Sequence, residues 1–137
     1  MTPKPSPRTT AVNSPFFEGC NRNELWLQRC QELRCRKYTY YPRVCCPHCG
    51  GGDLGWERVS GRGVIVSFAR IHRPQHDFFL SEAPYYFIAV RVPEGPLLFS
   101  RLHHEGPVSE TDLIGREVRA VFVAHTSQQR LVFFAPV

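Results

Sequence analysis

Six cysteines lie close together in the first part of this 137-residue chain, and none follows in the long remainder. They are Cys20, Cys30, Cys35, Cys45, Cys46 and Cys49. A secreted disulfide scaffold distributes its cysteines over the whole chain that it must hold together. In a reducing compartment, clustered cysteines bind a metal more often than they form disulfides. We therefore expect a metal-binding module near the N-terminus, followed by a domain that folds on its own apolar core.

The N-terminal segment is not expected to be a signal peptide. Residues 1–10 are polar and rich in proline, without the apolar stretch of a signal peptide. No run in the sequence reaches the roughly 18 apolar residues of a membrane span. We expect a soluble, cytoplasmic protein with no membrane partner. Residues 1–13 show no hydrophobic periodicity and are predicted to form a disordered tail.

The sequence Cys46-Pro47-His48-Cys49-Gly50 is typical of a zinc knuckle, in which a tight turn brings two thiolates to one ion. A tetrahedral site with four sulfur ligands needs a second pair of cysteines. Cys30 and Cys35 have four residues between them, which is within the usual spacing. Cys45 and Cys20 are expected to be free thiols, the latter as a small core residue. The prediction is one structural Zn²⁺ per chain, bound by Cys30, Cys35, Cys46 and Cys49.

Three alternatives for this cluster stay open at the level of sequence. His48 is a possible ligand in place of one cysteine, although it lies inside the knuckle where side chains point outward. Iron binds in the same four-thiolate geometry, as it does in rubredoxin, and an iron–sulfur cluster also uses cysteine ligands. A redox-active dithiol is the third alternative. A fully thiolate-coordinated ion leaves no open position, which favours a structural role over a catalytic one.

Short β-prone segments surround the cysteines. Ser14 and Pro15 are typical of a helix start, so a short helix is predicted over residues 14–23, anchored by Phe16 and Phe17. Two strands, 25–29 and 38–41, each lead toward a cysteine pair. This order is typical of a rubredoxin-like zinc ribbon, which we assign to residues 24–54.

The remainder of the chain, residues 55–137, is predicted to be entirely β. Five strands are expected, with a polar loop over 106–115 that contains one helical turn near Asp112. The first strand is predicted to be one long curved strand, bent at Gly61-Arg62-Gly63. Five strongly curved strands suit an OB-type β-barrel better than a sandwich, which usually has seven or more. The predicted strands are 56–71, 85–92, 97–102, 116–124 and 131–134.

The distribution of charge separates two classes of partner. The net charge is +5, and the whole excess lies in residues 1–50, which hold eight Lys or Arg against three Glu. Residues 51–137 hold nine of each sign. An OB-fold that binds single-stranded nucleic acid needs a basic groove. Binding of single-stranded nucleic acid is therefore the alternative function of this chain and not the favoured one.

The order of motifs gives a more specific indication. The Phe-rich helix and Leu27-Gln28-Arg29-Cys30 precede the knuckle, and Ser60-Gly61-Arg62-Gly63, His72-Arg73-Pro74 and Ala83-Pro84-Tyr85 follow it. Over residues 15–137 the chain resembles a family of small zinc-ribbon/OB-fold proteins associated with acyl-CoA metabolism, long catalogued as a domain of unknown function. The family usually presents the first pair as Cys-x-x-Cys followed by glycine. Here the first pair is longer, and Arg36 stands where the glycine is expected.

The resemblance implies a non-catalytic accessory subunit. Such proteins are similar to small subunits that bind thiolase-fold enzymes, including thiolases, acyltransferases and steroid side-chain aldolases, and that help to form or cover an acyl-CoA channel. A hetero-oligomer with such an enzyme is thus expected, with acyl-CoA at the shared interface. Cations and aromatic surface suit CoA; the candidate contacts are Arg43, Arg62, Phe68, Arg70, His72, Arg73 and Tyr85, with Tyr86 as a further aromatic.

No residue pattern indicates an independent enzyme. The sequence contains no nucleophile elbow, no phosphate-binding loop and no carboxylate pair with a supporting base.

Adjacent aromatic residues in the barrel strands indicate an interface. Because side chains alternate between the two faces of a strand, Tyr86 and Phe87 cannot both face the core, and neither can Phe133 and Phe134. One residue of each pair is expected at the surface, under the N-terminal helix or against a partner.

Overall fold

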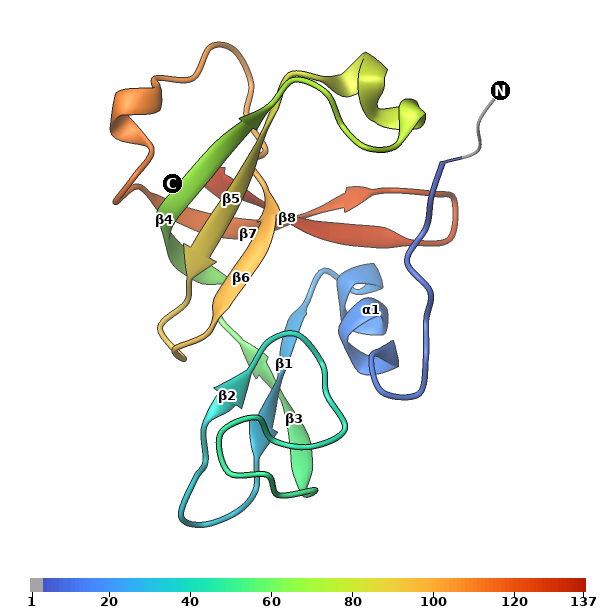
Figure 1. The fold of residues 1–137 in the computed structure, drawn as a ribbon, viewed down its shortest axis with the longest axis vertical. Helices are drawn as coiled ribbons and strands as arrows, with labels where there is room; N and C mark the ends of the chain where they lie inside the picture. Colours follow the sequence, from blue (N-terminus) through green and yellow to red (C-terminus); the bar gives the residue numbers. More distant parts are fainter. Residues whose placement is uncertain (1–3) are drawn as a thin grey trace.

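The computed structural model describes residues 4–137 as two antiparallel sheets and one short helix (Figure 1). The smaller sheet has three strands in the order β2-β1-β3, and the larger has five in the order β6-β5-β4-β7-β8. Two 3-10 helices, η1 (Asp77–Glu82) and η2 (Glu110–Asp112), lie in the loops of the larger sheet. The predicted class is confirmed: mainly β, with a short N-terminal helix, a zinc ribbon and a five-stranded OB-type barrel.

Helix α1 (Ser14–Asn21) docks the N-terminal part of the chain onto both sheets. Asn13 takes the N-cap position, which the sequence pattern assigns to Ser14. Phe16, Phe17 and Cys20 are buried, so Cys20 is the core residue that its position predicts. A Cβ atom on Gly19 would lie only 2.5 Å from the Trp26 ring. The absence of a side chain there allows the helix to approach the first strand this closely.

The ribbon sheet is centred on β1 (Leu25–Cys30). Strand β2 (Tyr38–Thr39) pairs with one edge of β1, and β3 (Leu54–Val59) pairs with the other over its full length. The prediction of a single curved strand over 56–71 is therefore wrong. The run divides into β3 in the ribbon sheet and β4 (Arg62–Ile71) in the barrel. The division falls at Gly61, whose φ of 82° is a backbone conformation that favours glycine.

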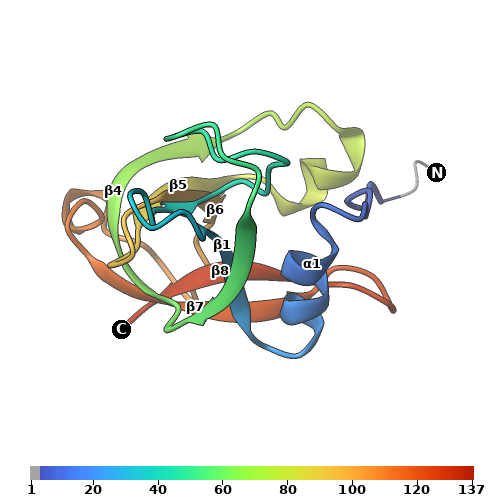
Figure 2. The same ribbon diagram turned by 90° about the horizontal axis from the view of Figure 1, so that it is seen from below.

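The larger sheet curls into a nearly closed barrel (Figure 2). Strand β4 pairs with β5 (Tyr85–Arg91) and, through its first three residues, with β7 (Glu117–Ala124). A bulge between Ile65 and Ser67 gives β4 the extra curvature for these two pairings. The outer strands are β6 (Leu97–Arg101) and β8 (Arg130–Pro136), and a parallel bridge between Leu102 and Phe134 joins them.

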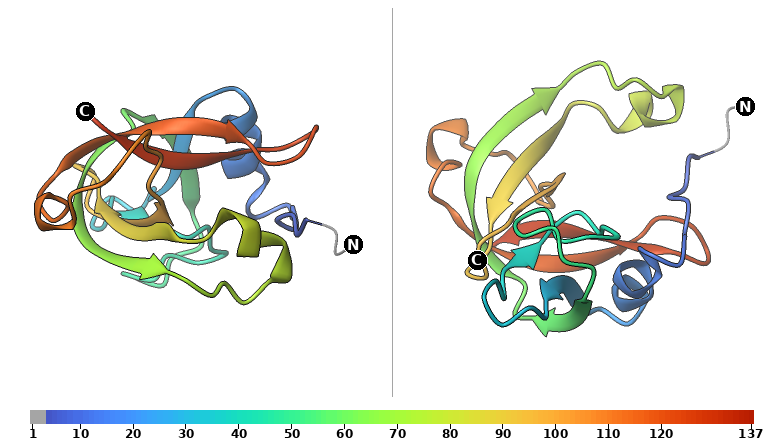
Figure 3. Two further views of the ribbon diagram at one scale, coloured as in Figure 1. Left: turned by 90° about the horizontal axis from the view of Figure 1, so that it is seen from above. Right: turned by 60° about the horizontal axis from the view of Figure 1, so that its bottom comes forward.

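One continuous core joins the barrel to the base of the ribbon. Its centre contains fully buried side chains from all five barrel strands, and α1 and the first half of β1 extend it. The β7–β8 hairpin reaches past the barrel to lie beside α1 (Figure 3), where Gln129 Nε2 donates to Phe17 O at 3.1 Å and Arg130 N donates to Asn21 Oδ1 at 2.8 Å. The core members include Ile65, Ile88, Val90, Leu98, Val118 and Phe134 together with Phe16, Phe17, Leu25 and Leu27.

The predicted disordered tail covers residues 1–13, of which 1–3 lie outside the described residues. Residues 4–10 have no helix or strand, and Ala11, Val12 and Asn13 form a turn before α1. The division into tail, helix, ribbon and barrel at 13, 23 and 54 stays a prediction. In residues 4–137, no helix has the length and apolar character that crossing a membrane requires.

Candidate functional site

Four cysteine sulfurs converge at the end of the ribbon that lies away from the barrel. The Sγ atoms of Cys30, Cys35, Cys46 and Cys49 all lie within 4.8 Å of one another. The closest approaches are 3.6 Å between Cys30 and Cys49, and 3.7 Å between Cys35 and Cys46. A tetrahedral Zn²⁺ with Zn–S bonds of about 2.3 Å separates its sulfurs by about 3.8 Å. The four thiols are therefore suited to hold one structural zinc.

Backbone N–H groups of the second knuckle point at its sulfurs. His48 N lies 3.4 Å from Cys46 Sγ, and Gly51 N lies 3.4 Å from Cys49 Sγ. Burial raises the pKa of the Cys46 thiol, but hydrogen bonds from the backbone of Cys49 and His48, together with those to the Cys35 and Cys49 thiols, lower it to about 7. Burial dominates at Cys30 and raises the pKa of that thiol to about 12. A bound cation deprotonates coordinating thiols outright, and N–H donors stabilise the resulting thiolates.

The two knuckles use different residues at the same turn position. The residue after the second cysteine of each pair is left-handed: Gly50 has φ 80° and Arg36 has φ 55°. Glycine adopts this conformation freely, whereas a residue with a Cβ atom does so at a cost of about 1–2 kcal/mol. In the longer first knuckle, Cys35 N and Arg36 N both donate to Glu32 O, at 2.9 and 3.1 Å. The inserted residues thus form one turn that returns Cys35 to the cluster.

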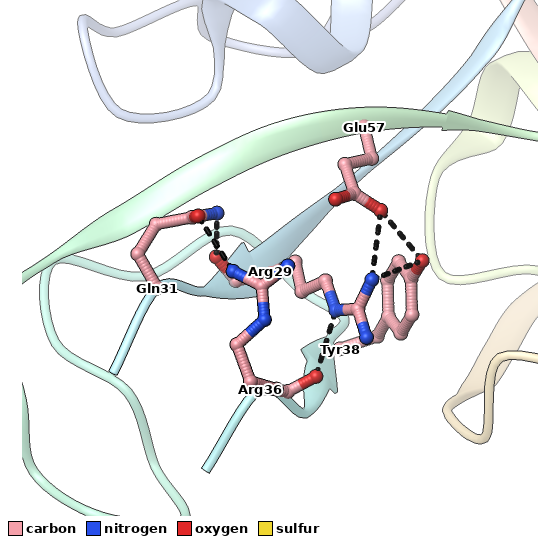
Figure 4. Close-up of polar contacts among 5 residues, drawn as sticks. All are labelled: Arg29, Gln31, Arg36, Tyr38 and Glu57. Atoms are coloured by element: carbon pink, nitrogen blue, oxygen red, sulfur yellow. Dashed lines mark hydrogen bonds and ion pairs between the residues drawn. The ribbon is translucent and has the colours of Figure 1, made fainter. Parts of the chain in front are cut away.

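A polar network supports the first knuckle from the adjacent sheet (Figure 4). Arg36 Nη1 donates to Gln31 Oε1 at 2.7 Å, and Gln31 Nε2 donates to Arg29 O at 3.1 Å. Arg29 Nε donates to Arg36 O at 2.8 Å. This bond holds the backbone of the left-handed Arg36, whose side chain is hydrogen-bonded to Gln31. The Arg29 guanidinium also lies 3.3 Å from Glu57 Oε2, and Tyr38 OH donates to the same oxygen at 2.6 Å.

This network shifts the pKa values of Tyr38 and Glu57 in opposite directions. The hydrogen bond to Glu57, followed by burial, raises the pKa of the Tyr38 phenol. The same hydrogen bond, with the nearby Arg29 guanidinium, lowers the pKa of the Glu57 carboxyl. No local sequence signal predicts this network. The residue pattern assigns Glu57 to the barrel, and it marks Tyr38 only as a β-prone residue of the ribbon.

The other cysteines and His48 lie away from the sulfur cluster. Cys20 lies on the buried side of α1, and its burial raises the pKa of its thiol to about 11. Cys45 is exposed and lies outside the sulfur cluster. His48 is also exposed, and its Nε2 lies 3.3 Å from Tyr38 O, so the ring faces the ribbon backbone. The geometry brings together the four predicted cysteines and no histidine.

The candidate acyl-CoA contacts are dispersed over the molecule. Arg43 is exposed on the ribbon, and His72 and Arg73 are exposed in the loop after β4. The other candidates fall in or near separate hollows. Arg62 lines a groove of about 550 Å³, Arg70 lines one of about 370 Å³ with Tyr86, and Tyr85 lines one of about 200 Å³. Phe68 packs against Tyr86 with ring centroids 6.0 Å apart.

The hollow at Tyr85 contains a residue that no sequence motif marks. The Arg101 guanidinium lies 3.9 Å from the Tyr85 ring centroid and 5.7 Å from that of Phe133. It also forms an ion pair with Glu82 of η1 at 3.0 Å. Arg101 at the end of β6 therefore contacts η1, the start of β5 and β8. No local pattern around Arg101 predicts these contacts.

The barrel strands place their adjacent aromatic residues on opposite faces. Tyr86 and Phe134 are buried, whereas Phe87 is 44% exposed and Phe133 is half-buried. Phe87 stacks on Phe99, which is 53% exposed, with ring centroids 6.2 Å apart and ring planes within 8°. An exposed stacked pair of this kind is typical of an interaction surface rather than of a core.

Comparisons with known proteins agree with this geometry. The family described as the ChsH2 rubredoxin-like zinc ribbon domain matches residues 17–55, and the ChsH2 C-terminal OB-fold domain matches residues 56–123. Among solved structures, the chain is similar to one from an Ltp2–ChsH2(DUF35) aldolase, with a TM-score of 0.80 and 29% identity. That likeness covers 96% of this chain and 98% of the other.

Two further relatives are more distant or larger. A protein of unknown function from the DUF35 family of Sulfolobus solfataricus shares the fold, with a TM-score of 0.60 and 18% identity over 94% of this chain and 87% of that one. A probable enoyl-CoA hydratase alpha subunit from Thermomonospora curvata is 33% identical over 99 residues, which are 72% of this chain. The matched region spans only 30% of that curated relative.

Proposed function

Because the chain carries the zinc-ribbon and OB-fold domains of ChsH2 proteins in that order, it belongs to this family of zinc-ribbon/OB-fold proteins, and we propose that it is an accessory subunit of a thiolase-fold enzyme. In this proposal the subunit is not catalytic itself and helps to form or cover the acyl-CoA binding channel of its partner. We also propose that Cys30, Cys35, Cys46 and Cys49 hold its structural zinc, and that it works in the cytoplasm, where thiols stay reduced.

The observation that carries the proposal is the full-length likeness to a chain of the Ltp2–ChsH2(DUF35) aldolase. The likeness extends over both domains, so it concerns the arrangement of ribbon and barrel and not only an OB-fold, which hosts many functions. The relative named as an enoyl-CoA hydratase subunit adds a second link to acyl-CoA chemistry. Both relatives are named as enzymes or enzyme subunits, which favours a protein that acts in a complex.

The dispersed candidate contacts support an incomplete site that a partner completes. Binding of CoA requires several cations and an aromatic or apolar wall in one place. Arg62, Arg70 and Tyr85 instead line three separate hollows. The described residues of this chain alone therefore provide no gathered CoA site. In the proposed complex, the enzyme supplies the remaining walls of the channel.

The proposal is tested by capture of the partner and measurement of the assembly. The purified chain is incubated with native cell lysate, and the bound proteins are identified and their mass measured by light scattering. A thiolase-fold enzyme is expected in a stable hetero-oligomer. The exposed double variant Phe87→Ser/Phe99→Ser should weaken capture at least ten-fold. The double variant Leu80→Ser/Ile114→Ser, at exposed loop positions that line none of these hollows, is the control and should retain it.

The isolated chain is also expected to turn over no acyl-CoA thioester, because acyl transfer needs an activated nucleophile or a poised acid–base pair. A thiolase or thioesterase rate that survives removal of contaminants contradicts that part of the proposal. A monomer that enriches no thiolase-like protein, yet binds single-stranded oligonucleotides with a strong salt dependence, would favour the nucleic-acid alternative.

A further inference from the structure

The N-terminal tail borders an aromatic groove on the side of the barrel. Pro5, Ser6 and Pro7 form one wall of this groove, which has a volume of about 560 Å³. Its other lining residues include aromatic side chains from the ribbon and from strands β5, β6 and β8. They include Tyr41, Phe87, Phe99 and Phe133. Residues near the start of the sequence and residues of three barrel strands thus line the same hollow.

Two contacts attach the first described residues of the tail to the barrel. The His125 Nε2–H group, in the β7–β8 hairpin, donates a hydrogen bond to Pro5 O. The Lys4 ammonium lies 5.3 Å from the ring centroid of Phe78 in η1, within the range of a cation–π contact. The tail passes close to the β7–β8 hairpin in Figure 3, in agreement with the first contact. The anchoring residues are separated from the tail by more than 70 positions in sequence.

A third anchor fixes the other end of the tail. The side chain of Asn13 is only 7% exposed; its Oδ1 accepts from Thr10 N at 2.7 Å and its Nδ2 donates to Arg8 O at 3.1 Å. The same Nδ2 lies 3.2 Å from Tyr41 OH, on the rim of the groove. Asn13 therefore holds the turn that directs residues 4–9 along the groove.

The composition of the tail matches the chemistry of such a groove. Prolines restrict the chain to extended backbone before binding, so little conformational entropy is lost when it docks. Aromatic-lined grooves recognise Pro-x-x-Pro and similar extended segments for this reason. Pro5 and Pro7 alternate with Ser6, and Lys4 and Arg8 flank them. The segment has the stiffness and the flanking cations of a groove ligand.

We propose that the aromatic groove recognises an extended Pro-x-Pro segment with basic flanks, and that residues 4–8 of the same chain form one side of it as a displaceable strap. Pro5, Ser6 and Arg8 are exposed, and the strap takes part in no sheet. The core begins at Phe16, so release of the strap leaves the core intact. This inference requires no enzyme partner and goes beyond the proposed function.

The test compares the full chain with a variant that starts at Thr10, using ¹H–¹⁵N and aromatic ¹H–¹³C NMR. Removal of residues 1–9 should shift the signals of His125, Phe87, Phe99 and Phe133. The signals of Gly50, Gly51 and Gly52, at the far end of the ribbon, should stay in place and confirm that the fold is retained. The synthetic peptide Lys-Pro-Ser-Pro-Arg-Thr, added to the shortened chain, should return the shifted signals toward their full-length positions in a saturable manner.

Point variants separate specific docking from non-specific contact. In the full chain, Pro5→Ala/Pro7→Ala and His125→Ala should each reproduce part of the shift that truncation causes. Thr9→Ala, at an exposed tail position, is the matched control and should cause none. A peptide with both prolines replaced by alanine should bind at least five-fold more weakly than the native peptide. Unchanged His125 and Phe133 signals after truncation would overturn the proposal, as would equal binding of the two peptides.

The measurement also distinguishes the strap from an exchange of tails between two copies. A strap within one chain gives signals that do not change on dilution, and the full chain sediments as a monomer. Exchange between copies gives a dimer whose groove signals shift toward those of the shortened chain on dilution. That second result would overturn occupancy by the same chain.

Discussion

The barrel and the far end of the zinc ribbon differ in how much apolar side chain each buries. In the barrel, Ile65, Ile88 and Phe134 are completely buried in a common core. Beyond Leu27, the ribbon buries little apart from cysteines and two polar residues, while Leu33 is 93% and Val44 is 72% exposed. Burial of apolar area is the main source of stability for a fold. The barrel therefore has its own source of stability, whereas the ribbon end depends on its metal and its polar network.

Removal of the metal is the largest expected perturbation of this comparison. Binding of structural zinc contributes about 10–16 kcal/mol in zinc-finger peptides near neutral pH. A chelator should therefore abolish the dispersion of amide signals from residues 30–52, while the barrel signals stay dispersed. The measurement is ¹H–¹⁵N NMR with metal analysis before and after chelation. Cooperative loss of both domains would show that the barrel also depends on the metal.

Single replacements locate the same effect on individual ligands. Cys30→Ser and Cys49→Ser should each lower the zinc content and reproduce the disorder of residues 30–52, because serine does not replace a thiolate ligand. Cys45→Ser is the matched control, since Cys45 is exposed and lies outside the sulfur cluster. It should retain one zinc per chain. If Cys45→Ser loses the metal while Cys30→Ser keeps it, the ligand assignment is wrong.

A cavity in the barrel core tests the other half of this comparison, the stability that apolar burial gives the barrel. Phe134 is fully buried, and replacement of a buried Phe by Ala typically lowers the free energy of unfolding by about 3–5 kcal/mol. Phe134→Ala should therefore shift the denaturant midpoint of the chain strongly. Phe99→Ala removes an equal volume from a side chain that is 53% exposed and should lower stability by only about 1 kcal/mol, mainly through the lost stacking on Phe87. Equal effects of the two variants would contradict the assignment of the barrel core.

The features that can be predicted well from sequence are those set by local patterns. The knuckle at Cys46 and Cys49, the first ribbon strand and the last four barrel strands all follow from spacing, alternation and turn residues. Gly61 and Gly63 predict a bend in the chain, but they do not indicate whether the two sides of the bend belong to one strand or to two sheets. A bend within one strand and a passage between two sheets have the same local signal, and only the pairing of Glu57 and its neighbours with β1 distinguishes them.

The features that cannot be predicted in this way depend on contacts between distant residues. His125 and Pro5 are 120 positions apart, and Arg29 and Glu57 are 28 apart. Neither pair belongs to a motif, so no window of the sequence contains the signal. The same reason applies to Arg101, since its partners Tyr85, Phe133 and Glu82 come from three other segments.

The Tyr38–Glu57 hydrogen bond gives a smaller effect that is confined to the ribbon. Glu57→Gln should lower the stability of the ribbon by about 1 kcal/mol at neutral pH, because a charge-assisted hydrogen bond becomes a neutral one. Both tryptophans of the chain lie in the ribbon sheet, so their fluorescence during thermal unfolding reports this change.

The pH dependence of this pair follows from the raised pKa of Tyr38. A raised pKa means that folding favours the neutral phenol, so the contribution is complete below the usual tyrosine pKa of about 10 and is lost as pH rises through the raised pKa. In Glu57→Gln, the ¹³Cζ signal of Tyr38 should titrate at lower pH than in the natural chain. Identical titration curves would show that the carboxylate does not act on the phenol.

The smallest expected effect concerns the left-handed residues that close the two knuckles. A Cβ atom at Gly50 would meet no other atom within 4 Å, so Gly50→Ala tests the backbone conformation alone. It should lower stability by about 1 kcal/mol. Arg36→Gly removes that conformational cost from the first knuckle but also removes the hydrogen bond to Gln31. The two effects are of similar size and opposite sign.

Arg36→Gly should therefore leave the stability of the ribbon within about 0.5 kcal/mol of the natural chain, whereas Arg36→Ala should lower it by about 1 kcal/mol. The alanine variant keeps the left-handed residue with its Cβ atom and loses the hydrogen bond, so nothing offsets the conformational cost. Zinc affinity by competition with a chelator and tryptophan-detected unfolding both measure the difference. If the glycine and alanine variants at position 36 lose equal stability, the side-chain contact alone supports the first knuckle. If both match the natural chain, the longer turn after Cys30 supports itself through its two backbone hydrogen bonds to Glu32 O.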